Sequence, residues 1–434
     1  MTIDAIVIGA GSRGQTYAGY ALTYPDRLRV VAVAEPLPDR RERLAAAHAI
    51  PAARQFASWE DLLARPPMAR AAIITTSDHL HTAPALAALE AGYDVLLEKP
   101  MAPRLDECVQ LVQAAERTGR VLQICHVLRY TPFFRTVREI VQSGRLGQVV
   151  TVEQRENVAF WHMAHSFVRG NWRNSQESSP MILAKCCHDL DILHWVLDSR
   201  PKTLSSVGSL MHFRAENAPA GAPMRCTDGC PAQETCPFYA PDIYIEQTPL
   251  ARAMGASPWI IRDYAGWPRS VVSPDVSREA LRRALETGPY GRCVYHCDND
   301  VVDHQVVSMQ FESGASVTLT MHGHSHLEGR TLRIDGARAT LLGAFSHEAW
   351  IEVHDHLTGA VERVTFDPYA SGHGGGDSGL MADFIAAMEG SKPALTSARV
   401  SLESHLMAFA AEEARLNATV VDMGEYRQRA EDGV

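Results

Sequence analysis

A glycine-rich turn near the N-terminus constrains the fold more than any other feature of this sequence. Gly9-Ala10-Gly11-Ser12-Arg13-Gly14 follows the apolar run 5–8 and leads into a helical pattern that starts at Gln15. Glycines at this spacing permit a tight turn between a strand and a helix, and the N-terminus of that helix can receive a pyrophosphate. The turn therefore predicts a dinucleotide site, with Gly9, Gly11, Ser12, Arg13 and Gly14 as its residues.

An acidic residue at the end of the second apolar run supports this interpretation. Glu35 lies 21 residues beyond Gly14, where a carboxylate suits the ribose hydroxyls of a dinucleotide. Because a carboxylate repels a 2′-phosphate, Glu35 favours NAD over NADP. Arg40 and Arg41 follow closely and leave NADP open as an alternative.

Short apolar runs alternate with helical patterns through the first 125 residues. This alternation indicates βαβ units and a parallel sheet. Beyond it, strand patterns follow one another with few helices between them, which predicts a mostly antiparallel, open sheet. We therefore expect an α/β Rossmann domain over residues 1–125 and an α+β domain over 126–434, in which residues 214–290 form an irregular, cysteine-rich insertion.

Composition narrows the classes of partner. The net charge of −10 argues against nucleic acid or an anionic membrane surface as the main partner. No apolar run approaches the roughly 20 residues that span a bilayer, and the N-terminus shows no signal-peptide pattern. Nine cysteines, an odd number, suit a reducing compartment better than a disulfide framework. We expect a cytoplasmic protein.

A lysine at the end of a predicted buried strand is the first candidate for chemistry. Lys99 stands in Glu98-Lys99-Pro100, directly after the apolar run 95–97. Desolvating an ammonium is costly, so a lysine at this position needs a partner or a function. Pro100 restricts Lys99 to an extended backbone and permits a cis peptide bond, which directs the side chain.

Further motifs carry a family resemblance over nearly the whole length of the chain. They are Thr76-Ser77-Asp78-His79-Leu80-His81, the Glu98-Lys99-Pro100 triplet, Arg129-Tyr130-Thr131-Pro132 and His188-Asp189-Leu190-Asp191. Together with the glycine turn, they resemble the Gfo/Idh/MocA-type oxidoreductases, the family of glucose–fructose oxidoreductase and the inositol dehydrogenases. The resemblance implies a Rossmann domain, a sugar-like substrate, and a C-terminal sheet whose open face often forms a homo-oligomer.

The resemblance also implies a chemistry and a set of site residues. A hydride passes between the nicotinamide of NAD(P) and a secondary hydroxyl of a sugar, cyclitol or glycoside. His188 is the implied proton acceptor and Lys99 the group that binds the reacting hydroxyl, while Thr76, His81, Glu98 and Lys99 join the cofactor contacts. An alternative is an NAD-dependent glycosidase that works by transient oxidation, elimination, water addition and re-reduction.

One departure from the family pattern concerns the residues before His188. The family has Asp four residues before the histidine and a small residue two before it, where this chain has Ala184 and Cys186. On a continuous helix, Lys185, His188 and Asp191 share one side. We therefore expect Lys185 to replace the missing Asp as the polar partner that keeps His188 neutral, with Asp191 orienting the ring or binding substrate. The alternative is a surface lysine.

Other polar side chains are candidates for substrate contacts. His162, Trp172 and Arg173 gather in a loop-like stretch before His188; together with Arg129 they suit a polyhydroxylated ligand, with Trp172 as a stacking face. An interdomain loop packed with amphipathic side chains is the equally weighted alternative. His373 lies in a glycine-rich segment that either closes over a site or simply enters a helix.

Three cysteines within eleven residues suggest a metal site in the insertion. Cys226, Cys230 and Cys236 are separated by three and five residues, and clustered thiols in a short loop suggest structural zinc. The spacing is not that of a standard zinc ribbon, and the fourth ligand would have to be Cys293 or Cys297. Unligated thiols or a lone disulfide are the alternatives.

Overall fold

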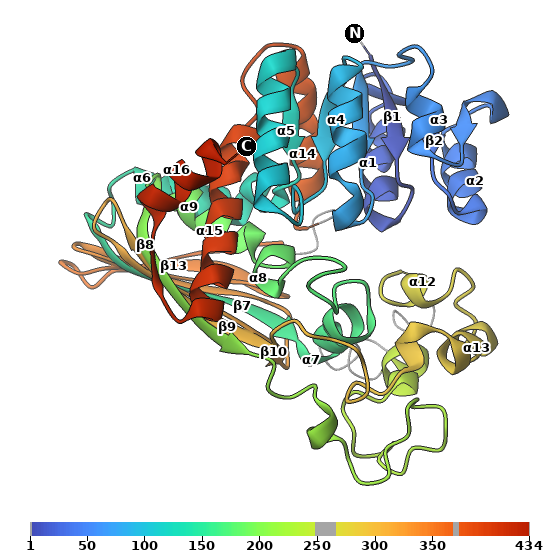
Figure 1. Ribbon diagram of the computed structural model, residues 1–434. Helices are drawn as coiled ribbons and strands as arrows, with labels where there is room; N and C mark the ends of the chain where they lie inside the picture. The colour runs from blue at the N-terminus through green and yellow to red at the C-terminus, as the bar shows by residue number, and fades with distance from the viewer. Residues whose placement is uncertain (1, 248–265, 368–372, 434) are drawn as a thin grey trace.

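The computed structural model describes residues 2–247, 266–367 and 373–433, which form two sheets with helices packed on them (Figure 1). The first sheet has six parallel strands in the order β3-β2-β1-β4-β5-β6. Its strands are β1 (Ile3–Ile8), β2 (Leu28–Ala34), β3 (Gln55–Phe56), β4 (Ala71–Ile74), β5 (Asp94–Leu97) and β6 (Leu122–Ile124). The predicted Rossmann fold is confirmed.

The central strands of this sheet are apolar along their whole length because both faces are covered. All four residues of β4 and of β5 are buried, as expected for parallel strands between two helical layers. The helices and short helical turns of this region are α1 (Ser12–Thr23), α2 (Pro38–Ala47), η1 (Ala52–Arg54), α3 (Trp59–Leu63), η2 (Asp78–Leu80), α4 (Thr82–Glu90) and α5 (Leu105–Thr118).

The second sheet has nine strands in the order β14-β13-β12-β11-β7-β10-β9-β8-β15. Its pairs are antiparallel except for the parallel pair of β7 and β10, so the predicted α+β domain is confirmed. The strands are β7 (Val149–Ala159), β8 (Pro201–Ser209), β9 (His304–Phe311), β10 (Ser316–Ser325), β11 (Gly329–Gly336), β12 (Ala339–Phe345), β13 (Ala349–Asp355), β14 (Val361–Phe366) and β15 (Val420–Asp422).

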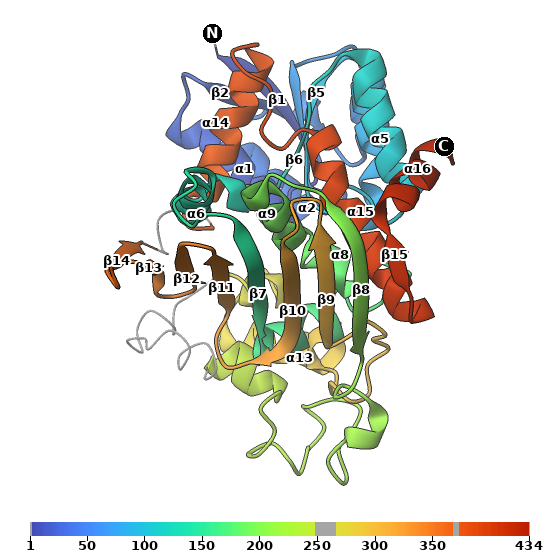
Figure 2. The same ribbon diagram turned by 90° about the vertical axis from the view of Figure 1, so that its left-hand side faces the viewer.

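Burial alternates along the strands of the second sheet because helices cover one face. In β7, the buried Val152, Gln154 and Glu156 alternate with the exposed Thr151, Glu153 and Arg155. The opposite, open face is seen with its strands side by side in Figure 2. The covering and connecting helices are η3 (Val127–Tyr130), α6 (Pro132–Gln142), α8 (Met181–Ala184), α9 (Cys187–Leu197), α15 (Ala398–Asn417) and α16 (Met423–Asp432).

The C-terminal part of the chain returns to the first sheet. Helix α14 (Gly376–Met388) packs against α1 and η3, and its Leu380 and Phe384 share a buried core with Tyr17. The predicted boundary at residue 125 separates two stretches of sequence. The hydrophobic core of the Rossmann region nevertheless includes the distant helix α14.

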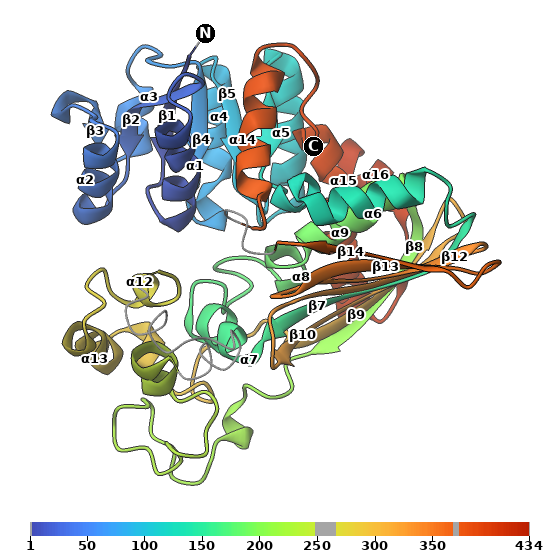
Figure 3. The same ribbon diagram turned by 180° about the vertical axis from the view of Figure 1, so that it is seen from behind.

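The expected insertion leaves the second sheet between β8 and β9. Its described part contains short helices: η5 (Ala215–Asn217), η6 (Asp242–Glu246), α12 (Arg269–Val272), α13 (Arg278–Thr287) and η7 (Pro289–Gly291). Of these, η6, α12, α13 and η7 pack beside α7 (Phe160–His162) and the π-helix η4 (Met163–Arg169), which follow β7 (Figure 3). None of the helices in the described ranges is long and apolar enough to cross a membrane.

Candidate active site

The three glycines of the N-terminal turn have different tasks. Gly9 has a φ of +92°, and a Cβ there would lie 2.7 Å from the carbonyl oxygen of Thr75. A Cβ on Gly14 would lie 2.1 Å from the carbonyl oxygen of Gly9. A Cβ on Gly11 would meet only the Arg40 guanidinium, at 4.0 Å. Gly9 and Gly14 therefore make the turn, whereas Gly11 keeps open space at the start of α1, which fits a pyrophosphate.

Glu35 lies beside this turn, as its position after β2 predicts. Its carboxylate accepts hydrogen bonds from the backbone N–H groups of Ala10 at 2.7 Å and Leu37 at 3.0 Å. Arg41 donates to the carbonyl oxygen of Glu35 at 2.6 Å. The structure thus brings a buried carboxylate to the glycine turn, and its binding of a ribose stays a prediction.

Arg13 and Glu98 join the glycine turn to the end of β5. Arg13 Nε lies 2.8 Å from Glu98 Oε1, and Arg13 Nη2 lies 2.6 Å from Asp377 Oδ1 at the start of α14. Tyr17 and the backbone N–H of Lys99 also donate to Glu98, at 2.8 and 2.7 Å. Burial raises the pKa of Glu98, but the Arg13 and Lys99 charges lower it by more, so the carboxylate is ionised. Arg13 and Glu98 therefore position the turn.

His81 and Thr76 hold the loop that follows β4. The His81 ring lies between two carbonyl oxygens, with Nδ1 2.7 Å from Pro100 O and Nε2 3.1 Å from Thr76 O. The Thr76 hydroxyl donates to Leu80 O at 3.0 Å. His81 therefore links this loop to the segment after Lys99, and a cofactor contact by either residue stays a prediction.

Lys99 reaches from the first sheet to the segment that carries His188. The Lys99–Pro100 peptide bond is cis, and Lys99 Nζ donates to the carbonyl oxygen of Ala184 at 2.8 Å. Ala184 ends α8, and His188 lies in the first turn of α9. The two residues with the strongest chemical expectation are thus joined through one short segment.

His188 is suited to accept a proton. Burial, together with the charges of Lys99 and Arg330, holds its pKa well below the usual range, so the imidazole is neutral at neutral pH. Its Nδ1 is buried and has no hydrogen-bond partner among the described residues. A neutral imidazole is in the protonation state that can take up a hydroxyl proton.

Two further buried histidines, which sequence reasoning missed, stand behind His188. The rings of His126 and His188 meet edge to face with centroids 5.5 Å apart, and His405 lies 5.7 Å from His126. Burial lowers the pKa of His126 to about 4 and that of His405 to about 3. Nothing in the local sequence marks them, because α15 brings His405 here from almost 280 residues away.

Arg129 and Asp191 are ion-paired with each other. Arg129 makes a bidentate ion pair with Asp191 at 2.7 and 2.6 Å, and both side chains are buried. Arg129 Nη1 also donates to the carbonyl oxygen of Leu395 at 3.2 Å. This geometry does not support the expected substrate contacts of Arg129 and Asp191, because a ligand would have to break a buried, fully paired interaction.

The expected pairing of Lys185 with His188 needs correction. Lys185 Nζ lies 2.9 Å from Glu328 Oε1 and 3.3 Å from Glu156 Oε1, and no hydrogen bond joins it to His188 within the described residues. The expectation assumed a continuous helix, but α8 ends at Ala184 and α9 begins at Cys187. Burial lowers the pKa of Lys185, but the two glutamates raise it by more, so the amine is charged.

Lys185 belongs to a buried group of charges that we call the Lys185 cluster. Its members are Lys185, Arg330, Glu156, Asp189 and Glu328. Arg330 bridges Glu156 at 2.5 Å and Asp189 at 2.9 Å. Burial raises the pKa of Glu156 to about 7 in spite of its two cationic neighbours.

The remaining substrate candidates separate in space. His162 Nδ1 lies 3.0 Å from Glu328 Oε1 and so adjoins the Lys185 cluster. Trp172 Nε1 donates to Asp78 Oδ2 at 3.0 Å, which joins the loop after β4 to the second domain. Arg173 makes a bidentate ion pair with Asp298 at 2.9 and 3.0 Å. Of the three, His162 is the one placed beside the charges around His188.

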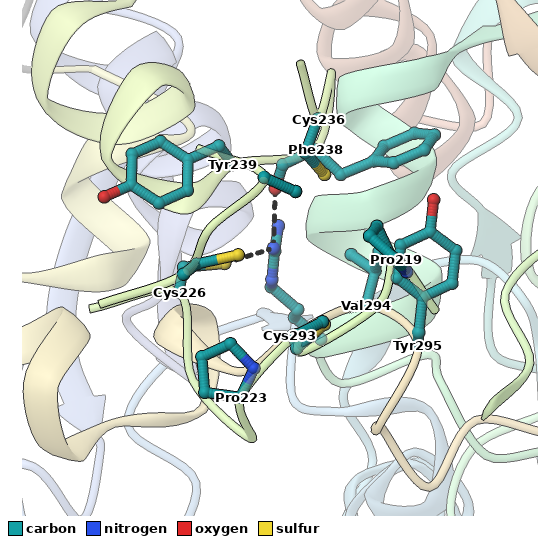
Figure 4. A pocket seen from close by; sticks show the side chains of 13 residues that line it. Pro219, Pro223, Cys226, Cys236, Phe238, Tyr239, Cys293, Val294 and Tyr295 are labelled. Atoms are coloured by element: carbon teal, nitrogen blue, oxygen red, sulfur yellow. Dashed lines mark hydrogen bonds between the residues drawn. The ribbon is translucent and has the colours of Figure 1, made fainter. Parts of the chain in front are cut away.

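The structure does not support the expected zinc site. Cys226, Cys230, Cys236 and Cys293 line one pocket together with Arg169. Figure 4 shows Cys226, Cys236 and Cys293 around it. Arg169 Nη2 donates to Cys226 Sγ at 3.5 Å and to Phe238 O at 2.7 Å.

No group of three metal-binding side chains in the described part of the chain could hold a metal ion. Burial raises the thiol pKa of Cys236, Cys293 and Cys297, so these thiols stay protonated, and all nine cysteines are free. The prediction of zinc, with Cys293 or Cys297 as fourth ligand, is corrected to a pocket lined by free thiols.

Comparisons with known proteins agree with this geometry. Residues 3–126 match the family model described as "Oxidoreductase family, NAD-binding Rossmann fold", and residues 138–423 match the model of its C-terminal alpha/beta domain. The putative oxidoreductase YteT of Bacillus subtilis is 23% identical over 329 residues, which cover 72% of this chain and 71% of YteT.

Inositol dehydrogenases are also similar. Inositol 2-dehydrogenase of Salmonella typhimurium is 28% identical over 205 residues, so the match spans 47% of this chain and 57% of that enzyme. The structure of scyllo-inositol dehydrogenase from Lactobacillus casei, with bound NAD(H) and scyllo-inositol, superposes with a TM-score of 0.65 at 15% identity. That superposition covers 98% of this chain and all of the other. The two family matches span most of the sequence, and the chain belongs to the Gfo/Idh/MocA family of oxidoreductases.

Proposed function

We propose that this oxidoreductase is a dehydrogenase that moves a hydride between NAD and a secondary hydroxyl of a sugar or cyclitol. The observation that carries the proposal is the hydrogen bond from Lys99 Nζ to Ala184 O, which places the end of β5 against the segment that leads to the neutral His188. Relatives that are inositol dehydrogenases support a polyol substrate.

The residues of this chain have separate tasks in the proposed reaction. Bound NAD supplies the hydride acceptor. His188 accepts the proton of the substrate hydroxyl, because its lowered pKa leaves the imidazole neutral at neutral pH. Lys99 has two N–H groups left beyond the one on Ala184 O; they bind the same substrate oxygen and stabilise negative charge that develops on it.

NAD is the proposed cofactor in preference to NADP. Glu35 presents a buried carboxylate next to the glycine turn, where it would repel a 2′-phosphate. Arg41 is hydrogen-bonded to the backbone of Glu35. Arg40 lies close to Gly11, where its charge suits the pyrophosphate. Both arginines therefore have another proposed role, and neither is assigned to the 2′-phosphate of NADP.

Assembly and compartment complete the proposal. The open face of the second sheet supports a homo-oligomer formed through that face, and strand β8 exposes Val207 on it, with 69% of the residue accessible. Free thiols at all nine cysteines support a reducing, cytoplasmic setting.

The test is turnover on a panel of cyclitols and methyl glycosides with added NAD. We expect net NADH formation, measured by absorbance, that His188→Gln abolishes. The panel also includes nitrophenyl glycosides, because release of nitrophenol without net NADH would show the redox-neutral glycosidase instead. The similar proteins with named activities are oxidoreductases and dehydrogenases, which does not favour that alternative.

A further inference from the structure

The Lys185 cluster lies beside the proposed reaction centre, although the proposed mechanism makes no use of it. Lys99 Nζ is anchored on the carbonyl oxygen of Ala184 at 2.8 Å, and the next residue, Lys185, contacts Glu328 at 2.9 Å. Glu328 in turn contacts His162 at 3.0 Å. A series of contacts therefore runs from Lys99 through residues 184–185 and Glu328 to His162.

Glu328 is the carboxylate of this cluster that solvent reaches. Its side chain, in the loop between β10 and β11, is 38% exposed, whereas the side chains of Glu156 and Asp189 are fully buried. Burial raises its pKa, but the charge of Lys185 and the hydrogen bonds from His162 and Ala159 lower it by more, so Glu328 is ionised. The cluster thus presents a negative oxygen outward.

The donors around Glu328 fix its carboxylate and leave one acceptor position for a further hydrogen-bond donor. Oε1 accepts from Lys185 Nζ and His162 Nδ1, at 2.9 and 3.0 Å. Among residues 2–247, 266–367 and 373–433, Oε2 accepts one hydrogen bond, from the backbone N–H of Ala159 at 2.8 Å. A carboxylate has about four acceptor positions, so Oε2 retains one for a ligand that donates, such as a hydroxyl.

The net charge of the Lys185 cluster is zero or negative. Lys185 is shared between Glu156 and Glu328, and Arg330 between Glu156 and Asp189. Two cations thus face three carboxylates, and the net charge runs from −1 to zero as Glu156 takes up a proton near pH 7. Both cations are occupied, so a ligand carboxylate here would be repelled in a water-poor setting.

Aromatic rings pack against His162, which contacts the same carboxylate. His162 lies against Trp161, with centroids 5.9 Å apart, and edge to face against Trp267 of the insertion at 4.8 Å. Aromatic rings provide broad apolar faces with a polar edge, and the C–H face of a sugar ring is apolar. A hydroxyl acceptor beside aromatic faces suits a polyhydroxylated ring.

We propose that Glu328, fixed by Lys185 and His162, binds a substrate hydroxyl and selects neutral sugars or cyclitols against sugar acids. This inference rests on the proposed dehydrogenase function and names its substrate class. It assigns Lys185 a positioning role toward Glu328. It also makes His162 the sequence-predicted substrate residue whose task is best defined.

The experiment compares matched pairs that differ only at C6: the methyl glycosides of glucose, galactose and mannose, and the corresponding methyl uronosides. The full-length enzyme with NAD is expected to show kcat/KM at least tenfold higher for the neutral member of a pair that it turns over. In Glu328→Gln, the neutral member should lose about 10- to 100-fold, the range for a hydrogen bond to a charged group, and the acid should lose less. The neutral-to-acid ratio therefore falls.

A structural role alone would lower both members equally, so the ratio is the decisive readout. Glu312→Gln is the matched control, because Glu312 is exposed in the turn between β9 and β10, and its ratio should equal that of the wild type. Wild-type enzyme that uses both members equally overturns the proposal, as does an unchanged ratio in Glu328→Gln.

Binding separates this proposal from the proposed function. Calorimetry on NAD-loaded protein measures the dissociation constants of the same pairs without turnover. No NADH from any sugar would defeat the dehydrogenase proposal; the selectivity of Glu328 would still be supported by a neutral preference in binding that Glu328→Gln removes. Equal binding of neutral and acidic members would overturn it.

Discussion

The proposed cofactor side and the proposed substrate side of this site are built by different means. On the cofactor side, the turn at 9–14 shapes the space with backbone, and Gly11 contributes by having no side chain. On the substrate side, the Lys185 cluster shapes it with paired side chains from β7, α9, β11 and the loops beside them. The backbone-built side follows a short sequence pattern, whereas the side built from charges depends on which distant segments meet.

The largest expected effect comes from the two residues where these sides meet. His188→Gln and Lys99→Met should each lower kcat by about 10²- to 10⁴-fold, because each removes a group that handles the reacting proton or oxygen. NAD affinity, measured by fluorescence titration, should change little in His188→Gln. His194→Gln is the control on the same helix, since His194 Nδ1 lies 2.8 Å from the carbonyl oxygen of Ser199; equal loss in both histidine variants would contradict the assignment.

A second prediction asks whether Arg129 and Asp191 belong to the substrate side or to the scaffold. Asp191→Ala leaves a buried guanidinium without its carboxylate, and should lower the free energy of unfolding by about 3–5 kcal/mol, measured by urea denaturation. The double variant Arg129→Met/Asp191→Leu should recover part of that loss. A large rise in KM with unchanged stability would instead indicate that these two residues bind substrate.

The glycines provide a third prediction, which separates scaffold from ligand space on the cofactor side. Gly11→Ala should fold with unchanged thermal stability yet bind NAD about tenfold more weakly, because its Cβ enters space in which the nearest non-neighbouring atom of the described residues is Arg40 Nη1, at 4.0 Å. Gly14→Ala should lower both stability and NAD affinity, because its Cβ would lie 2.1 Å from Gly9 O. Equal melting temperatures for the two variants would refute this division of tasks.

The same contrast explains how much the sequence could predict. The parallel sheet, the glycine turn, Glu35 and Lys99 follow from apolar runs and spacing, and resemblance to a family added His188. Partners of these residues lie far away in the chain: Arg13 binds Asp377, and Lys185 binds Glu328. Such pairs need the tertiary arrangement, which no local pattern contains.

Strand register and a break between two helices explain the contacts of the Lys185 cluster that the sequence did not predict. Glu156 and Arg330 are ion-paired because β7 and β11 place them directly opposite each other, and a strand pattern alone does not reveal that register. The spacing of Lys185 and His188 predicted one shared helix side, but the break between α8 and α9 turns Lys185 toward the glutamates.

The smallest expected effect is a pH dependence of stability that arises on the substrate side. The pKa of Glu156 is about 7 in the folded protein, above its ordinary value of 4.5. Between these values the folded state binds more protons at Glu156 than the unfolded state does, so this residue makes the free energy of unfolding fall as pH rises. Glu156→Gln removes that contribution. Urea denaturation from pH 5 to 8 should therefore show wild-type stability decreasing, relative to Glu156→Gln, across this window and levelling off above pH 7. Glu153→Gln, on the cluster-free face of β7, should follow the wild type. A constant difference between wild type and Glu156→Gln would mean that the Lys185 cluster keeps Glu156 ionised throughout, and that its charge is fixed at −1.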